Sequence, residues 1–326
     1  MATTYRPPPG PGEPAAAPGS GAMAHRRGTS GPPAHILVVN GRKVHQPVFV
    51  LGTPWSGTEL LARSLKRSPG FHLTMGQRWV LPVVHGFARS PSIVRGRQEA
   101  AATALRDALA QGWQVNAYCC LGCSQACREA GGAAGSTGPC VSERGIARYG
   151  DASPELLYCA ESLVAAFPDA RLVQIIRDGR DVAAAMLADP QALAWFQPGV
   201  VNLAAEPTHP LLGVENEADR SSWPAMSLPG KCALRWRSAV RLMARLRGKL
   251  TAQQLITLRY EEMVRQPAAA ASAVSAFIGA DVPPLAAPAQ GSGLEPGYWR
   301  RVLALAQVAE VERVASEELR RVGYGT

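Results

Sequence analysis

The fold is decided by the stretch Pro47-Val-Phe-Val-Leu-Gly-Thr-Pro-Trp-Ser-Gly-Thr-Glu-Leu-Leu-Ala-Arg-Ser-Leu65. Val48 to Leu51 is a short apolar run typical of a buried strand, and Ser56 to Leu65 has apolar residues at helical spacing. Gly52 to Gly57 is therefore predicted to be a tight turn from a strand into a helix. Backbone N–H groups at a helix N-terminus lack partners within the helix, and the Ser and Thr hydroxyls of this turn add further donors. The stretch predicts a cradle for a phosphate or a similar anion.

This turn is not the loop of an ordinary ATPase. A Walker A loop needs G-x-x-x-x-G-K-[ST], with the Lys on the β- and γ-phosphates, and Thr58 stands where that Lys belongs. A glycine-containing turn between any strand and helix is the alternative interpretation of the stretch.

Composition limits the partners of the chain. The 326 residues have a formal net charge of +9, and Lys43, Lys66, Lys231 and Lys249 are the only lysines, so the basic excess is almost entirely Arg. No Lys/Arg block is long enough to predict nucleic-acid binding, and no apolar run approaches the roughly 18 residues of a membrane-spanning helix. The N-terminus has no apolar region of a signal peptide, so we expect a cytoplasmic protein with no integral membrane segment. Its oligomeric state does not follow from the sequence.

The chain divides into two parts. Residues 1–34 are rich in Pro, Gly, Ala and Ser and are predicted to be a disordered tail, and residues 35–326 are predicted to form one domain. A hairpin is expected over 35–51, because Asn40-Gly41 favours the type I′ turn. Beyond it, predicted strands alternate with predicted helices, which favours an α/β fold: a parallel sheet with helices on both faces and ligands at the carboxyl ends of the strands. The predicted strands include 71–73, 171–176 and 254–260, and the predicted helices 78–88, 99–110, 155–166, 177–186, 232–250, 268–278 and 299–322.

A Cys-rich insertion at about 111–145 interrupts this alternation. Cys120-Leu-Gly-Cys123 has the spacing of metal ligands, and two further cysteines could complete a tetrahedral thiolate site for structural zinc. A second C-x-x-C pair is missing, which favours incidental or redox-active thiols instead. We expect no catalytic metal.

A second strand-to-helix junction has a basic residue at its mouth. Arg171 to Ile176 is an apolar run of the buried parallel type, and Arg177-Asp-Gly-Arg-Asp-Val182 opens the next helix. Together with the first junction this passage resembles PAPS-dependent sulfotransferases of the bacterial type, which have a P-loop-like architecture. The resemblance covers roughly residues 47–324 outside the Cys-rich insertion and the Pro-rich segment 191–229, and it also rests on Gly150-Asp-Ala-Ser-Pro154, Phe167-Pro-Asp-Ala170, Leu258 to Val264, Pro267 to Gly279 and Tyr298-Trp-Arg-Arg301.

The resemblance implies a function and a donor site. The chain would move a sulfuryl group from 3′-phosphoadenosine-5′-phosphosulfate (PAPS) to a hydroxyl of a small-molecule or lipid-like acceptor. The loop would hold the 5′-phosphate, Arg177 the 3′-phosphate, and Trp236 or Trp299 the adenine. The donor-binding residues implied in this way are Thr53, Pro54, Trp55, Ser56, Gly57, Thr58, Glu59, Arg177, Trp299 and Arg300.

The sequence departs from the family at this site. Trp55 stands where the loop usually has the Lys or Arg that meets the bridging oxygen, and Glu59 replaces the closing Thr or Ser. The other departures are Gln77 where a Glu often supplies the base, Ala152 for a Lys and Ala185 for a Ser. Replacements could come from elsewhere: Arg78 or Arg63 as the cation, and Asp151, His72, His85 or Glu59 as the base. We take Asp151, His72 and Arg78 as the catalytic candidates, although Asp151 could equally be a helix cap or turn former.

Two alternatives remain. The departures at the loop are also what a pseudoenzyme of the same fold would show, one that binds nucleotide or a partner without efficient catalysis. A small-molecule kinase is the weaker alternative, because the Walker Lys is missing.

Overall fold

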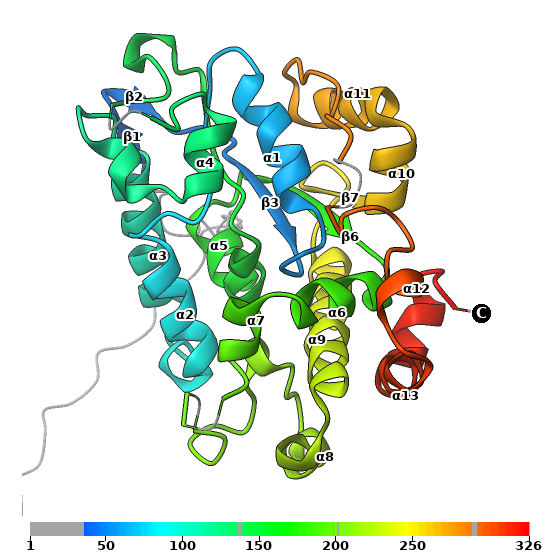
Figure 1. Ribbon diagram of the computed structural model, residues 1–326. Coiled ribbons are helices and arrows are strands. Elements are labelled where there is room, and N and C mark those ends of the chain that lie inside the picture. The colour runs from blue at the N-terminus through cyan, green and yellow to red at the C-terminus, as the bar shows by residue number, and fades with distance from the viewer. Residues whose placement is uncertain (1–35, 136–137, 198, 201, 289–291, 326) are drawn as a thin grey trace, which may run out of the picture. The chain divides into compact units, whose positions relative to one another are not determined.

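Five parallel strands form the central sheet, in the order β4-β5-β3-β6-β7 (Figure 1). β3, which leads into the predicted anion loop, lies in the middle, and all five of its residues are buried. Its registers with β5 and β6 leave the carboxyl end of β3 beside that of β6. The strands are β3 (Val48–Gly52), β4 (Phe71–Thr74), β5 (Arg148–Asp151), β6 (Arg171–Ile176) and β7 (Leu255–Arg259).

The side chains of β3 alternate between two layers of helices. Phe49 and Leu51 pack with the helices α2, α3 and α5, and Val48 and Val50 pack with α1 and α11. A buried strand between two layers is apolar throughout, which is why Val48 to Leu51 has no polar side. The predicted α/β fold with helices on both faces of a parallel sheet is thus confirmed. These helices are α1 (Thr58–Arg67), α2 (Leu81–Arg89), α3 (Gln98–Gly112), α5 (Ala160–Ala166) and α11 (Pro267–Ile278).

The structure is a computed structural model that describes residues 36–135, 138–197, 199–200, 202–288 and 292–325. Residues 36–326 group into one compact unit. The tail predicted over residues 1–34 lies outside the described residues.

The hairpin predicted over 35–51 is shorter than expected. Only β1 (Val38–Val39) and β2 (Arg42–Lys43) pair antiparallel, with Asn40 and Gly41 both at positive φ as a type I′ turn requires. The second arm was predicted to continue to Leu51, and this was wrong. Val48 leaves the hairpin because β3 pairs on both sides with parallel strands of the main sheet.

A second layer of packing lies beside the sheet, where α9 contacts α6 and α13. Trp236 and Val240 of α9 pack there with Val182 of α6 and Val311 of α13. The closing helix predicted over 299–322 is broken in two at Leu303 and Ala304, because both residues adopt extended backbone. The bounds of these helices are α6 (Gly179–Leu187), α9 (Leu228–Lys249), α12 (Trp299–Val302) and α13 (Leu305–Arg321), and the short helix α10 (Tyr260–Arg265) follows β7.

Segment 191–229 is more regular than its prolines suggested. α7 (Pro190–Ala194) begins one residue before the segment and runs into it, and α8 (Glu217–Ser222) lies within it. Gly213 lies in the turn between them at φ +81. A Cβ at this position would come within 2.5 Å of the backbone of α9 at Arg235, so only glycine fits. The turn therefore packs directly on α9.

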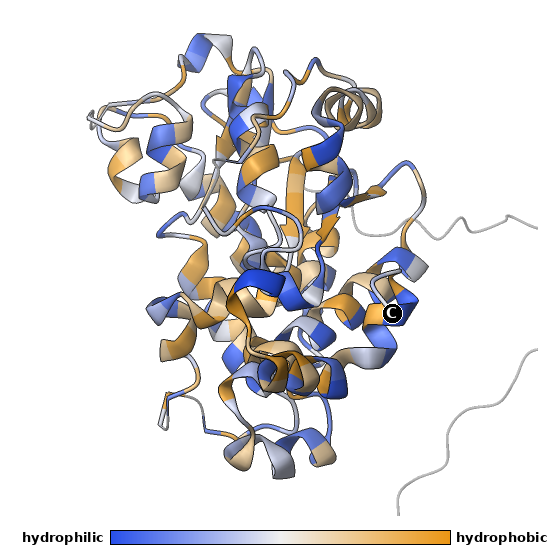
Figure 2. Cartoon of the chain, turned by 45° about the vertical axis from the view of Figure 1, so that its right-hand side comes forward, coloured by the Kyte–Doolittle hydropathy of each residue, from blue (hydrophilic) through white to orange (hydrophobic). Residues whose placement is uncertain are grey.

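Hydrophobic residues lie mainly on the strands and on the inward sides of the helices (Figure 2). Among the described residues, no helix combines the length and the apolar character needed to cross a bilayer. The Cys-rich segment is built from α4 (Gln125–Ala130) and short 3₁₀ turns, and it packs on α1.

Candidate active site

The predicted loop turns from β3 into α1 within five residues. The Ser56 N–H donates to the Thr53 carbonyl at 2.9 Å, which closes the turn, and Gly57 caps α1 at φ +93. The Thr53 and Ser56 hydroxyls are buried and have no hydrogen-bond partner within the described structure. Two unpaired hydroxyls at the head of a helix are the donor set that an anion needs. The residues present therefore fit a phosphate group.

Arg177 lies beside this loop, just past the end of β6. Its Nη1 donates to the Trp55 carbonyl at 3.1 Å and its Nη2 to the Gly293 carbonyl at 3.2 Å, while Nε has no hydrogen-bond partner in the described structure. The guanidinium carbon lies 4.6 Å from the centre of the Tyr260 ring. The structure thus brings Arg177 against the loop, as the resemblance implied, but in contact with carbonyl groups.

Asp181 ties the C-terminal segment to the same place. Its carboxylate accepts from the Gly297 N–H at 2.8 Å and from the Trp299 N–H at 2.9 Å, and it lies 4.0 Å from Arg177 Nε. Burial raises the pKa of Asp181, while the two backbone donors and Arg177 oppose that rise. Segment 293–299 is therefore held over Arg177, although it lies more than a hundred residues away in the sequence.

The indole of Trp299 lies between two arginines. Arg180 and Arg300 place their guanidinium carbons 4.4 and 4.5 Å from its ring centre, and its Nε1 has no partner among the described residues. Trp236, the other tryptophan considered for adenine, is a core residue: it is 1% exposed, its Nε1 donates to the Arg177 carbonyl, and its ring packs on Gly179. Trp299 is half-buried, and its role in adenine binding stays a prediction.

Trp55 occupies the loop position where a cation was expected. It adopts φ +68, which is uncommon for a bulky residue, and its Nε1 donates to Asp189 at 3.1 Å. Glu59, the other departure inside the loop, points outward and accepts from Arg63 Nε at 2.9 Å. Arg63 is therefore paired outside the loop.

Asp151 and His72 lie below the loop along the strand direction. Asp151 is level with Phe49, three residues before Gly52, which places it about 10 Å short of the end of β3. It is fully buried and accepts from Thr74 Oγ1 and from the Ser153 N–H, the bond of an Asx turn. Burial raises the pKa of Asp151 to about 6. The turn-forming role is thus visible, and its catalytic role stays a prediction.

His72 is level with Tyr149 and so lies still lower, with its ring edge-on to that tyrosine. Burial, helped by the charge of Lys66, lowers the pKa of His72 to about 4, so the imidazole is neutral at pH 7. Neither ring nitrogen has a hydrogen-bond partner among the described residues. Its role as a base also stays a prediction.

Arg78 and Gln77 contact the Cys-rich insertion. The Arg78 side chain is exposed and stacks on Trp79, while the backbone N–H of Arg78 donates to the Gly122 carbonyl at 2.9 Å. Gln77 is buried, with its Nε2 3.7 Å from Cys123 Sγ. The insertion therefore supports residues 75–78, which follow β4.

The seven cysteines are all free. In the described ranges, no group of three or more His, Cys, Asp or Glu side chains is placed to hold a metal ion. Lys66 lies among the thiols instead, with its Nζ 3.4 Å from Cys127 Sγ and 3.5 Å from Cys140 Sγ. Side-chain hydrogen bonds link Cys120 with Cys123 and Cys140, and Cys123 with Cys127, so the cysteines proposed as ligands lie together, and the zinc interpretation stays a prediction.

Sequence reasoning missed a polar group on the other side of Trp55. Arg235 of α9 is 2% exposed, its Nε donates to the Tyr158 hydroxyl at 3.0 Å, and its guanidinium carbon is 5.6 Å from the centre of the Trp55 ring. Burial raises the pKa of the nearby Glu155, against the charge of Arg235. A signal was available, because Arg235 interrupts the buried side of α9 between Cys232 and Ala239.

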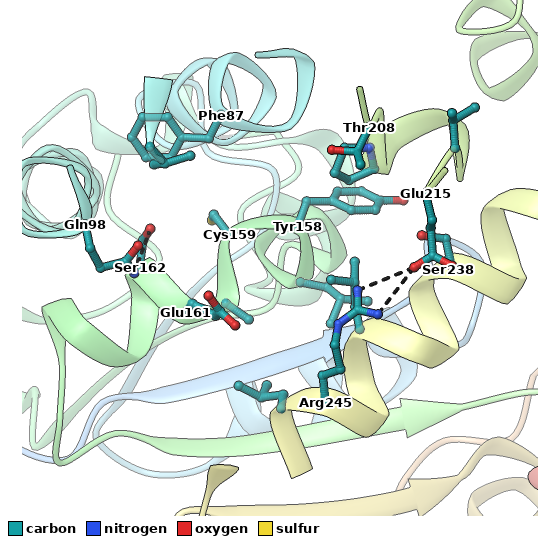
Figure 3. A pocket seen from close by; sticks show the side chains of 17 residues that line it. Phe87, Gln98, Tyr158, Cys159, Glu161, Ser162, Thr208, Glu215, Ser238 and Arg245 are labelled. Carbon is teal, nitrogen blue, oxygen red and sulfur yellow. Dashed lines mark hydrogen bonds and ion pairs between the residues drawn. The ribbon is translucent and has the colours of Figure 1, made fainter. Parts of the chain in front are cut away.

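A cavity of about 470 Å³ lies beyond Tyr158 (Figure 3). Its lining is apolar at Phe87, Leu157 and Leu242, polar at Ser238 and Thr208, and charged at Glu161, Glu215 and Arg245. No residue of the loop 52–57 lines it, and Tyr158 connects it to Arg235.

Comparisons with known proteins agree with the resemblance. A model of the sulfotransferase family matches residues 47–206 of the chain. None of the curated protein sequences compared with the chain matches it.

Solved structures of similar fold are also sulfotransferases. The sulfotransferase domain of the Synechococcus olefin synthase is 14% identical, with 83% of this chain and 94% of that chain covered and a TM-score of 0.43. A sulfotransferase from Alicyclobacillus acidocaldarius is 18% identical, with 84% and 97% covered and a TM-score of 0.39. A mouse sulfotransferase complexed with PAP is 13% identical, with 84% and 85% covered and a TM-score of 0.39.

Proposed function

We propose that the chain transfers a sulfuryl group from PAPS to a hydroxyl of a small-molecule acceptor in the cytoplasm. The observation that carries this proposal is the pair of unpartnered buried hydroxyls, Thr53 and Ser56, at the head of α1 beside Arg177. Hydroxyls and N–H groups of the loop would hold the 5′-phosphate, and Arg177 would meet the 3′-phosphate. The family match over 47–206 supports the transferase class.

Binding at Arg177 requires a local rearrangement. Its Nη2 donates to the Gly293 carbonyl, so a phosphate has to displace that carbonyl. We therefore expect segment 293–299 to shift when the donor binds. Trp299 and Arg300 belong to this segment and would follow the adenine and the 3′-phosphate, with Asp181 as the fixed point of attachment.

The cavity beyond Tyr158 is the proposed acceptor pocket. Its apolar wall and polar rim suit a small acceptor with a hydrophobic body and a hydroxyl, and a cavity of about 470 Å³ has the size of a ligand pocket. Because Tyr158 contacts Arg235, which faces Trp55, an acceptor that extends past Tyr158 would bring its hydroxyl toward the loop. Glu155 and Asp151 are the carboxyl groups proposed to take the proton.

Calorimetry with adenosine 3′,5′-bisphosphate tests the donor site. We expect saturable binding, and weaker binding of adenosine 5′-monophosphate, which lacks the 3′-phosphate. No heat at millimolar bisphosphate would refute the proposal. Equal affinity for the two nucleotides would refute the 3′-phosphate site.

A second candidate function is nucleotide binding without efficient catalysis. It is favoured by two departures at the loop. Trp55 carries no positive charge for the bridging oxygen, and Glu59 is an acid whose partner, Arg63, is therefore not free to supply that charge. Labelled PAPS separates the two functions: transfer of label to a member of a phenol, sugar and lipid panel requires the enzyme, whereas bisphosphate binding without transfer favours the second candidate.

A further inference from the structure

Arg235 is a buried cation that forms no salt bridge with any of the described residues. It is 2% exposed, its Nη1 has no hydrogen-bond partner, and no carboxylate of the described residues lies within 4 Å of its guanidinium. Its Nε donates to the Tyr158 hydroxyl. Burying a charge is costly unless the charge is paired, so this guanidinium is suited to an anion that the protein itself does not supply.

Arg235 lies beside the loop residue at which a positive charge was expected. Trp55 is anchored at both ends, with its carbonyl accepting from Arg177 and its Nε1 donating to Asp189. Arg235 lies over the ring of this residue, 5.6 Å from its centre. The guanidinium is therefore beside the loop residue that stands where a Lys or Arg was expected.

Several ionisable groups lie around Arg235. Burial, together with the charges of Arg89 and Arg235, lowers the pKa of His85, so that imidazole is uncharged at neutral pH. Burial raises the pKa of Cys232, and that thiol is neutral as well. Burial raises the pKa of Glu155, against the charge of Arg235, and Asp189 accepts from the Trp55 indole that Arg235 faces.

We propose that Arg235, from α9, supplies the cation that Trp55 has displaced from the loop. This inference rests on the proposed function. In the transfer, the acceptor oxygen forms a bond to sulfur, and the bond between sulfur and the bridging 5′-phosphate oxygen breaks. That electron pair stays on the bridging oxygen of adenosine 3′,5′-bisphosphate, and the acceptor proton goes to a base. Arg235 stabilises the negative charge that collects on the bridging oxygen.

The test compares the affinity of adenosine 3′,5′-bisphosphate for four proteins, since this product has the full charge on its 5′-phosphate. Arg235→Gln keeps a donor for Tyr158 and removes the charge, and we expect it to bind about tenfold to a hundredfold more weakly. Arg237→Gln is the control: Arg237 lies two residues away on α9, is partly buried and pairs with Asp219. We expect its affinity to stay within about twofold of the wild type.

The fourth protein, Trp55→Lys/Arg235→Gln, returns the cation to the loop and should recover most of the lost affinity. Wild-type binding with no loss in Arg235→Gln, or a loss that Trp55→Lys does not recover, would overturn the inference and leave the proposed function standing. Absence of binding by the wild type would overturn both. If Arg235→Gln does not fold, Arg235→Lys decides: affinity near the wild type supports a role of the charge, and a loss beyond about tenfold contradicts it.

Discussion

The ring of Tyr260 lies directly against Gly57, the residue that caps α1. A Cβ on Gly57 would come within 2.2 Å of the ring, so no other residue fits there without displacing Tyr260. The Tyr260 hydroxyl donates to the Leu294 carbonyl at 2.7 Å, and burial raises its pKa to about 12 despite the charge of Arg177. One tyrosine from the start of α10 therefore braces the loop, Arg177 and the C-terminal segment together.

We expect Gly57→Ala to abolish binding of the bisphosphate and to lower the melting temperature. The substitution combines positive φ with the clash against Tyr260. Gly279→Ala is the matched control, because Gly279 has φ +66 but open space around it, and it should cost only about 1–2 kcal/mol of stability. Thermal denaturation and calorimetry check both variants. Equal effects of the two would show that Tyr260 yields.

Ser56→Ala should separate binding from stability. The Ser56 hydroxyl is buried without a partner, so its removal should leave the melting temperature unchanged or raise it. Affinity for the bisphosphate should fall by about 1.5–3 kcal/mol, the value of a hydrogen bond to a charged group. Ser64→Ala, on the helix α1 that follows the loop, removes a buried hydroxyl that donates to the Pro284 carbonyl and should leave affinity intact. A loss of stability without a loss of affinity in Ser56→Ala would contradict the assignment of the loop.

Substitutions of Arg177 and Arg180 should have different effects, the first on nucleotide binding and the second on stability. Arg177→Met should weaken bisphosphate binding by about 1.5–3 kcal/mol, since its guanidinium is proposed to meet the 3′-phosphate. Arg180→Met should mainly destabilise the fold, because Arg180 pairs with the buried Asp178 at 2.8 Å and with Glu312 at 2.9 Å. Calorimetry at a temperature where both variants are folded measures the difference. A loss of affinity in Arg180→Met alone would reverse the assignment.

The pKa of Asp151 predicts a pH dependence of stability. Burial raises this pKa from 3.8 to about 6, so the folded protein binds a proton that the unfolded chain has released between these values. The contribution of Asp151 to stability is therefore fully present below pH 3.8 and is lost as the pH rises through about 6. In the wild type, the free energy of unfolding should fall by on the order of 3 kcal/mol between about pH 4 and pH 7 because of Asp151, and Asp151→Asn should lack this fall.

Urea unfolding of the wild type and of Asp151→Asn at both pH values measures this difference, and the other titrating groups cancel in the comparison. Identical pH profiles would show that the carboxyl is not perturbed. The same variant also tests the catalytic prediction, because a base at Asp151 requires that the transfer rate fall while bisphosphate affinity stays constant.

The sequence alone determined two central strands of the sheet and the position of the loop. Val48 to Leu51 and, apart from Gln174, Leu172 to Ile176 are apolar on both sides because they are buried between two helical layers, and this local pattern needs no tertiary information. The turn at Gly52 to Gly57 was equally local. The end of the hairpin at Lys43 was not a local feature, because Val48 pairs in the parallel sheet with residues more than a hundred positions away.

Only the tertiary structure decided which side chains surround the loop. Asp151 looked close to it along the chain, but the strand register places it about 10 Å lower. Arg235 lies 180 residues from Trp55 in the sequence, yet the packing of α9 brings its buried charge over that ring. Spacing in the sequence predicts contacts within a turn or a helix, whereas contacts between elements depend on register and packing, which no local pattern encodes.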